Sequence, residues 1–287
     1  MKVLITGATG FIGNHVIEEI LKIEDCKIIA TSLLSEDRAR EFDWYNHVKY
    51  ICHDLNDSND NYFTFFEKPD LLIHLAWPGL PNYKELFHFE KNLFLSYNFI
   101  KNLVENGLKD LSVIGTCLEY GMKSGSLAED ILTTPVTSYG LAKDTLRKFL
   151  EEFNTVHPFN FKWIRLFYLY GKGQNPNSLL SQLDRALDNG EEIFNMSGGE
   201  QLRDYLPVKK AAEFIVKISL QNELKGKINC CSGEPITIRE LVENHLKKRK
   251  KKIKLNLGYY PYLNYEPFAF WGDNRKLKSI LKLSDRA

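Results

Sequence analysis

The stretch of sequence that decides the fold is Lys2-Val-Leu-Ile-Thr6, followed directly by Gly7-Ala-Thr-Gly10-Phe-Ile-Gly13. The first five residues form an apolar, β-branched run that is typical of a buried strand, and apolar residues at helical spacing follow from Phe11 to Leu21. Glycines at such a strand-to-helix turn let the backbone approach a pyrophosphate, and the helix N-terminus offers free N–H groups. The sequence therefore predicts that a dinucleotide binds at Gly7, Thr9, Gly10, Phe11, Ile12 and Gly13.

The same alternation of strand and helix continues along the chain. Further strands are expected at about 27–31, 48–52, 70–75, 111–116 and 161–167, with helices in the intervals. This succession predicts an α/β fold, a doubly wound parallel sheet of the Rossmann type with a smaller C-terminal substrate-binding domain. We expect residues 1–165 to form the dinucleotide-binding domain and residues 166–287 to form mainly the substrate domain. Residues 206–231 read as a helix and a strand that return to the main sheet.

Composition excludes several classes of protein. The 287 residues carry 38 Lys+Arg against 37 Asp+Glu, a formal charge of +1, so we expect no nucleic-acid partner. Apolar stretches fall short of the roughly 20 residues that span a bilayer, and no signal peptide is recognisable, which predicts a cytoplasmic protein without a membrane partner. Five cysteines and seven scattered histidines fit no metal-ligand spacing, so no metal is expected.

A basic run stands out at Lys247 to Lys252. It is interpreted as a solvated helix end and turn, with a phosphate-binding or targeting patch as the alternative.

The chain contains a second motif, Tyr139-Gly-Leu-Ala-Lys143, and this motif and the glycine turn occur together in a known family. Together they resemble the extended short-chain dehydrogenase/reductases, the group of nucleotide-sugar epimerases, dehydratases and reductases. The similarity covers nearly the whole chain and includes Asp54-Leu55, His74-Leu75-Ala76, Thr116 to Gly121 and Arg203-Asp204-Tyr205. It implies that Asp54 and Leu55 lie at the adenine and that Leu75 and Ala76 line the dinucleotide.

The end of the second strand bears on the choice between NAD and NADP. An acidic residue at this point usually grips the 2′-hydroxyl of NAD, but the residues here are Thr31-Ser32-Leu33. With no carboxylate to repel it, a 2′-phosphate can be accepted by Ser32 and by Arg38. The sequence thus favours NADP(H) and leaves NAD(H) open, and Arg38 is equally well explained as a surface helix residue.

Tyr139 and Lys143 lie one turn apart on one face of the predicted helix. An ammonium about 4 Å from a phenol contributes roughly 4 kcal/mol at an effective dielectric constant of 20, so Lys143 is expected to lower the pKa of Tyr139. The resemblance implies that Thr116 hydrogen-bonds the reacting sugar oxygen, that Tyr139 exchanges its proton, and that Lys143 also holds the nicotinamide ribose.

The residues after Thr116 narrow the reaction. By the resemblance, 4,6-dehydratases carry Asp-Glu where this chain has Cys117 and Leu118, and epimerases that act through a cysteine carry it at the place of Leu118. The sequence therefore predicts reduction at C4 of a nucleotide-diphosphate sugar, most specifically a thymidine diphosphate 4-keto-6-deoxyhexose. A nucleotide-sugar 4-epimerase is the alternative, and a non-catalytic NADP-binding protein is the third interpretation.

The expected substrate residues lie on both halves of the chain. Trp77 and Tyr168 flank the cofactor end, and Tyr168 stands where the family has an asparagine. Asn177 ends a Gly/Pro/Asn-rich segment predicted to hold the ligand. Arg203 matches the family's arginine on the sugar-nucleotide diphosphate, and a salt bridge with Asp204 is the alternative.

Assembly follows from the resemblance as well, because the family dimerises through a four-helix bundle. The segment Leu86 to Val104 offers apolar side chains for a homodimer, namely Phe87, Phe94, Leu95, Phe99 and Ile100.

Overall fold

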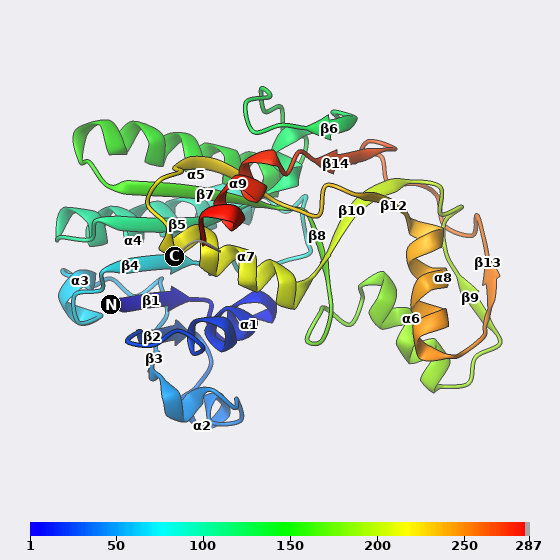
Figure 1. Ribbon diagram of the computed structural model, residues 1–287, viewed down its shortest axis with the longest axis horizontal. Helices are drawn as coiled ribbons and strands as arrows, with labels where there is room; N and C mark the ends of the chain where they lie inside the picture. The colour runs from blue at the N-terminus through cyan, green and yellow to red at the C-terminus, as the bar shows by residue number, and fades with distance from the viewer. Residues whose placement is uncertain (285–287) are drawn as a thin grey trace.

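The computed structural model describes residues 1–284 and is built around a parallel sheet of seven strands (Figure 1). In spatial order these strands are β11 (Gly226–Cys230), β7 (Asn160–Leu166), β5 (Asp110–Thr116), β4 (Leu71–His74), β1 (Lys2–Thr6), β2 (Lys27–Ser32) and β3 (Lys49–Cys52). Each strand runs parallel to its neighbours. The predicted doubly wound α/β fold is confirmed.

Helices cover both faces of this sheet, which explains the continuous apolar runs in its strands. One face carries α1 (Phe11–Ile20), α7 (Val208–Leu220) and α9 (Arg275–Ser284), and the other carries α3 (Tyr62–Phe65), α4 (Leu93–Glu105) and α5 (Ser138–Val156). Side chains alternate between the two cores along β1, with Val3 and Ile5 in the first and Leu4 in the second.

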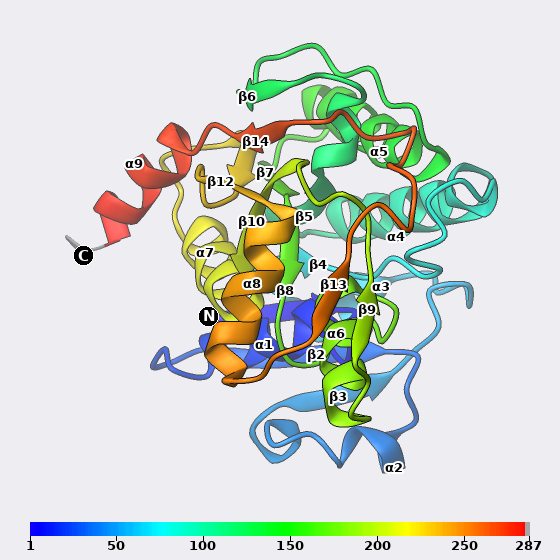
Figure 2. The same cartoon turned by 90° about the vertical axis from the view of Figure 1, so that its right-hand side faces the viewer.

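A smaller lobe extends from the carboxyl ends of the strands, as Figures 1 and 2 show. It contains α6 (Leu179–Asp188), α8 (Ile238–Arg249), β9 (Ile193–Asn195), β13 (Lys254–Asn256), β8 (Tyr168–Tyr170), β10 (Leu202–Pro207) and β12 (Pro235–Thr237). Strands β6 (Gly125–Leu127) and β14 (Phe270–Gly272) pair above it. Leu183, Phe194 and Val242 belong to the core of this lobe.

The chain crosses between the two parts more than once. Helix α7 packs on α1, and β11 lies at the sheet edge beside β7. Helix α9, which falls in the range expected to form mainly the substrate domain, packs on α7 instead. The remaining short elements are α2 (Glu36–Ala39), two 3₁₀ turns, η1 (Tyr45–His47) and η3 (Cys117–Tyr120), and a π-helical turn, η2 (His88–Asn92).

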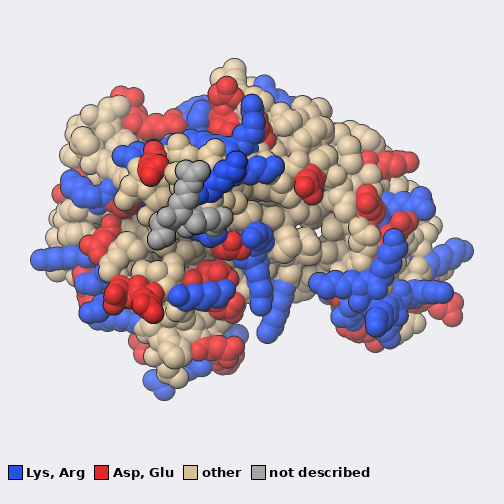
Figure 3. Space-filling model, viewed as in Figure 1, with Lys and Arg blue, Asp and Glu red and all other residues tan. Residues whose placement is uncertain are grey.

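The basic run occupies the last turn of α8 and the residues after it. Its side chains are exposed, and Figure 3 shows Lys and Arg gathered over this end of the lobe. Arg249 Nη2 donates to Asp188 Oδ1 at 2.6 Å, and cations at a helix C-terminus also complement its dipole. Within residues 1–284, no helix is both long and apolar enough to cross a membrane.

Candidate active site

A cavity of about 1310 Å³ opens at the carboxyl ends of the strands. The strand order reverses between β1 and β4, and crevices at such a switch point are where doubly wound sheets bind ligands. Its lining comes from the turns after β1, β4 and β5 on one side and from the smaller lobe on the other. Residues from both parts of the molecule therefore surround one cavity.

The glycine turn forms a close-packed cradle at one end of the cavity. Gly7 has φ +67°, and a Cβ there would lie 2.9 Å from the backbone nitrogen of Ala76. A Cβ on Gly13 would lie 2.2 Å from the oxygen of Gly7, whereas the Gly10 N–H donates to that oxygen at 3.0 Å. Thr9, Phe11 and Ile12 also line the cavity. Only glycine fits at positions 7 and 13, and the space that this leaves suits a pyrophosphate against the N-terminus of α1.

Ser32, at the end of β2, forms hydrogen bonds with two neighbouring hydroxyl groups. Thr9 Oγ1 lies 2.8 Å from Ser32 Oγ, which lies 2.7 Å from Tyr50 Oη. Ser32 lines the cavity, but Arg38 is exposed on α2 and is not among the described residues that line it. Of the two residues considered for a 2′-phosphate, Ser32 therefore lies at the cavity and Arg38 lies away from it.

Asp54 and Leu55 also line this part of the cavity. Asp54 Oδ1 accepts from the Asn56 N–H at 2.9 Å, which lowers the pKa of Asp54. Leu75 and Ala76, after β4, direct their N–H groups to Thr6 Oγ1 at 3.2 Å each. All four residues predicted for the cofactor in these loops face the same cavity.

Tyr139 and Lys143 come from the first turns of α5. The Gly140 N–H donates to Thr137 Oγ1 at 3.1 Å and caps the helix, and the Tyr139 N–H donates to the carbonyl of Tyr83 at 3.0 Å. Lys143 Nζ donates to the carbonyl of Ile114 at 2.8 Å. The Thr137 side chain and the carbonyls of Tyr83 and Ile114 thus fix the place of the pair.

Burial sets the protonation of both side chains. It raises the pKa of Tyr139 well above the ordinary value, helped by Tyr83 and Glu119, while a hydrogen bond with the Thr116 side chain acts the other way. Burial lowers the pKa of Lys143 to about 7. The expected lowering of the Tyr139 pKa by Lys143 is therefore not found, because the loss of solvent raises that pKa instead.

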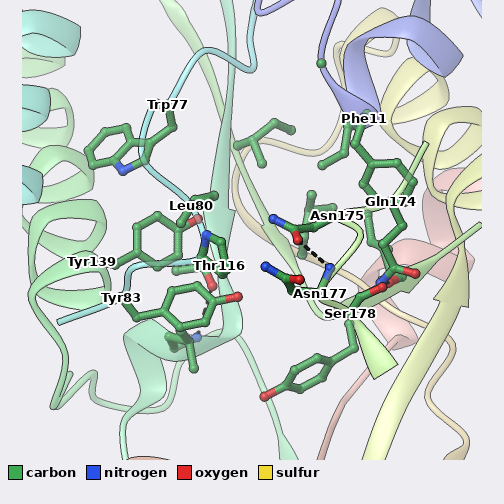
Figure 4. Close-up of a pocket in the computed structure, with 18 of the residues that line it drawn as sticks. Phe11, Trp77, Leu80, Tyr83, Thr116, Tyr139, Gln174, Asn175, Asn177 and Ser178 are labelled. Carbon is green, nitrogen blue, oxygen red and sulfur yellow. Dashed lines mark hydrogen bonds between the residues drawn. The ribbon is translucent and has the colours of Figure 1, made fainter. Parts of the chain in front are cut away.

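Trp77 forms the wall beside this pair. Lys143 Nζ lies 3.8 Å from the centre of the Trp77 ring, a cation–π contact, and the Trp77 and Tyr139 rings meet edge to face at 6.0 Å. Trp77 Nε1 donates to His88 Nδ1 at 3.0 Å. Figure 4 shows Trp77, Tyr83 and Tyr139 on one side of the cavity, facing Asn175, Asn177 and Ser178 on the other.

Arg203 lies in the cavity with a partner other than the one considered. Its guanidinium pairs with Glu266 at 3.0 Å, while Asp204 Oδ1 accepts from the Ser232 N–H at 2.8 Å. Tyr168 lies beside it, with the Arg203 guanidinium carbon 5.9 Å from the ring centre. The alternative of an Arg203–Asp204 salt bridge is therefore wrong. Glu266 lies 63 residues after Arg203, so the spacing of residues in the sequence did not predict this pair.

Glu119 is a site residue that the sequence reasoning missed. Its carboxylate is fully buried, and Oε1 accepts from the Thr116 N–H at 2.8 Å. The signal was present in Thr116-x-x-Glu119, the pattern of a capping box, in which the side chain of the first residue and that of the fourth each bind the other's backbone.

The comparisons with known proteins agree with this geometry. Residues 3–231 match the model of the NAD dependent epimerase/dehydratase family. The chain is 30% identical over 274 residues, 95% of this chain and 99% of the other, to a dTDP-6-deoxy-L-talose 4-dehydrogenase (NAD(+)) of Aggregatibacter actinomycetemcomitans. It is 27% identical over 271 residues, 87% and 82% of the two chains, to a dTDP-4-dehydro-6-deoxyglucose reductase of Escherichia coli.

Among solved structures, a UDP-N-acetylglucosamine 4-epimerase from Methanobrevibacter ruminantium M1 aligns with a TM-score of 0.86 at 24% identity, over 97% of this chain and 91% of that one. This likeness concerns the fold. The family match over most of the chain, on a doubly wound sheet with its cavity at the switch point, leads to one conclusion: this chain belongs to the NAD-dependent epimerase/dehydratase family.

Proposed function

We propose that this protein reduces the C4 keto group of a thymidine diphosphate-linked 4-keto-6-deoxyhexose with a nicotinamide cofactor. The observation that carries the proposal is the meeting of Thr116, Tyr139 and Lys143 at one end of the cavity, without an acid–base pair after Thr116. Two curated relatives, a dTDP-6-deoxy-L-talose 4-dehydrogenase and a dTDP-4-dehydro-6-deoxyglucose reductase, support this substrate class.

Each of the three side chains has a task in this reaction. When bound, the nicotinamide supplies a hydride to C4. Tyr139 then donates its proton to the C4 oxygen, and its raised pKa keeps that proton in place until negative charge develops there. Thr116, whose side chain lies close enough to act on the pKa of Tyr139, orients the same oxygen, and Lys143 holds the cofactor ribose.

The neighbouring thiol supports reduction over elimination. Cys117 is buried, and burial raises the pKa of its thiol well above the ordinary value. A thiol that stays protonated near neutral pH removes no proton from carbon, and Leu118 has no titratable group. With elimination disfavoured, the remaining reaction is chemistry at C4, which needs only the cofactor and the trio of Thr116, Tyr139 and Lys143.

The cavity wall supports a 6-deoxy sugar. Trp77, whose ring meets that of Tyr139, lines the cavity, and so do Pro78, Leu80, Phe167 and Tyr168. An apolar wall favours a methyl group over a hydroxymethyl group at C6, although one such contact discriminates by only about 1–3 kcal/mol.

For the cofactor we propose NAD(H), with NADP(H) also accepted. The relative at 30% identity is named for NAD(+). Ser32 occupies the position at which a carboxylate would repel a 2′-phosphate, so NADP(H) is not repelled there. Arg38, however, is exposed and does not line the described cavity, so it gives NADP(H) no support.

The 4-epimerase remains the second candidate, because it needs the same trio and because a 4-epimerase shares the fold. An epimerase regenerates its cofactor in every cycle and retains it. If the purified protein carried NAD through gel filtration and interconverted two 4-epimers without net redox change, the epimerase would replace the reductase. A protein that bound the cofactor and turned over neither substrate would instead be a binding module.

We propose that Arg203, which lines the cavity, binds the diphosphate of the substrate. A guanidinium binds phosphate oxygens with two parallel hydrogen bonds, which lysine does not reproduce. We expect Arg203→Lys to raise KM much more than it lowers kcat, while Arg239→Lys, at an exposed residue of α8, changes neither. Steady-state kinetics with the keto sugar measures both constants, and an unchanged KM for Arg203→Lys would refute the assignment.

We also propose a homodimer through α4 and α5. Phe99 and Ile100 are buried within the subunit, whereas Phe94 is 50% exposed on α4, and Leu141 and Phe149 on α5 are 46% and 39% exposed. The dimer surface is therefore expected to include these three side chains. Sedimentation at micromolar concentration should find a dimer that Phe94→Glu weakens, and a wild-type protein that sediments only as a monomer would contradict the proposal.

A further inference from the structure

A buried ionic cluster lies directly beneath Thr116, and its centre is Glu119. The Glu119 carboxylate accepts from the Thr116 N–H at 2.8 Å, from Trp163 Nε1 at 2.9 Å and from Arg165 Nε at 2.7 Å. Arg147 Nε, which has no hydrogen-bond partner among residues 1–284, lies 3.9 Å from the same carboxylate. Glu119 thus joins the carboxyl end of β5 to β7 and to α5.

The backbone around the cluster is shaped for this carboxylate. A Cβ on Gly115 would lie 2.2 Å from Trp163 Nε1 and 2.5 Å from Glu119 Oε1. A Cβ on Gly140 would lie 2.7 Å from the carbonyl of Leu118, so α5 approaches η3 closely. The glycines therefore leave room for a contact that brings the Thr116 segment against the helix of Tyr139 and Lys143.

We propose that Glu119 is a positioning residue of the active site, which fixes Thr116 against Tyr139 and keeps a negative charge behind Lys143. This inference rests on the proposed roles of the trio. Glu119 does not reach the cavity, since it is not among the described residues that line it, and so it acts through its neighbours.

The charge of Glu119 acts on Lys143 across the cluster. Burial lowers the pKa of Lys143 to about 7, and the Glu119 carboxylate opposes this shift. Among the described residues, Lys143 acts on His74 on β4 and on His88 on η2, and Tyr139 lies one turn away on the same helix; burial disfavours the charged form of each of these three groups. Loss of the carboxylate therefore makes Lys143 lose its proton at a lower pH, and Arg165, which pairs with Glu119 at 2.7 Å, then acts in the same direction.

The test compares Glu119→Gln with a matched control, Asp144→Asn. Asp144 is also a buried carboxylate and pairs with Arg147 at 2.7 Å and with Lys148 at 2.7 Å, without a contact to Thr116. We expect Glu119→Gln to lower kcat by about 100-fold with little change in KM, the loss that a misplaced reacting group produces. We also expect NADH binding, followed by fluorescence, to weaken at a lower pH than in the wild type. Asp144→Asn should show neither change.

A second variant, Glu119→Asp, separates position from charge. Its shorter side chain keeps the charge but does not span Thr116 and Arg165 together, so kcat should fall while the pH profile of NADH binding stays that of the wild type. If Glu119→Gln does not fold, this variant alone decides, and a wild-type kcat for it would overturn the proposal. Equal behaviour of Glu119→Gln and Asp144→Asn would overturn it as well.

Failure of the proposed function gives a different result. If the wild type equilibrates 4-epimers instead of reducing the keto sugar, the same comparison of variants is made on epimerisation. If the wild type turns over neither sugar, the NADH-binding profiles decide: a shift in Glu119→Gln alone supports the role of Glu119, and its absence overturns it.

Discussion

Replacement of Tyr139 by phenylalanine should abolish most turnover while leaving cofactor binding intact. The change removes only the hydroxyl that donates the proton, and general acid catalysis contributes about 10²–10⁴-fold to a rate. The ring contacts with Trp77 at 6.0 Å and with Tyr83 at 5.6 Å remain. We therefore expect kcat to fall by about two to four orders of magnitude and the Kd for NADH to stay near that of the wild type.

The matched control for this variant is Tyr83→Phe. It removes a hydroxyl from the same wall of the cavity, without a proposed part in proton transfer, and should lower kcat far less. Stopped-flow or steady-state absorbance at the nicotinamide band gives kcat for both variants. A Tyr139→Phe protein that keeps more than about a tenth of wild-type kcat would contradict the role of Tyr139 as the acid.

Lys143→Met should damage both cofactor binding and turnover. The ammonium is buried, donates to the carbonyl of Ile114 at 2.8 Å and lies over the Trp77 ring, so no water replaces it at the cofactor ribose. Removal of a buried group that hydrogen-bonds a ligand costs about 2–4 kcal/mol or more, which corresponds to a Kd for NADH higher by at least about thirtyfold. Lys148→Met, on the exposed side of the same helix, should leave the Kd unchanged, and fluorescence titration distinguishes the two results.

The wild-type protein should also lose NADH affinity as the pH rises. The pKa of Lys143 is lowered to about 7, so the ammonium that holds the cofactor is present below that value and is lost above it. In Lys143→Met this dependence should disappear, which separates the titration of Lys143 from that of other groups.

The glycine turn and the strands of the main sheet were predictable because their signals are local. Lys2–Thr6 is a strand followed directly by glycines, and the contact that forbids a side chain at Gly13 lies within the turn between β1 and α1. The contact at Gly7 is made with Ala76 after β4, so it depends on a distant part of the chain. The pair Tyr139 and Lys143 was predictable for the same reason, since one turn of helix fixes their spacing.

Properties that depend on distant parts of the chain were not predictable. Arg203 finds Glu266 rather than its sequence neighbour Asp204, because the segment after β13 folds back over the lobe. Arg38 was considered for a 2′-phosphate, with a surface helix residue as the equal alternative, and it is exposed on α2. The pKa of Tyr139 depends on how completely the folded chain excludes water, which no spacing of residues reveals.

The proposed reduction is tested most directly by following the absorbance of NADH and of NADPH while a thymidine diphosphate 4-keto-6-deoxyhexose is added to the purified protein. We expect one nicotinamide to be oxidised for each sugar reduced at C4, with NADH at least as effective as NADPH, and no oxidation with the 4-hydroxy sugar. Interconversion of two 4-epimers without any net change in nicotinamide absorbance would contradict the account.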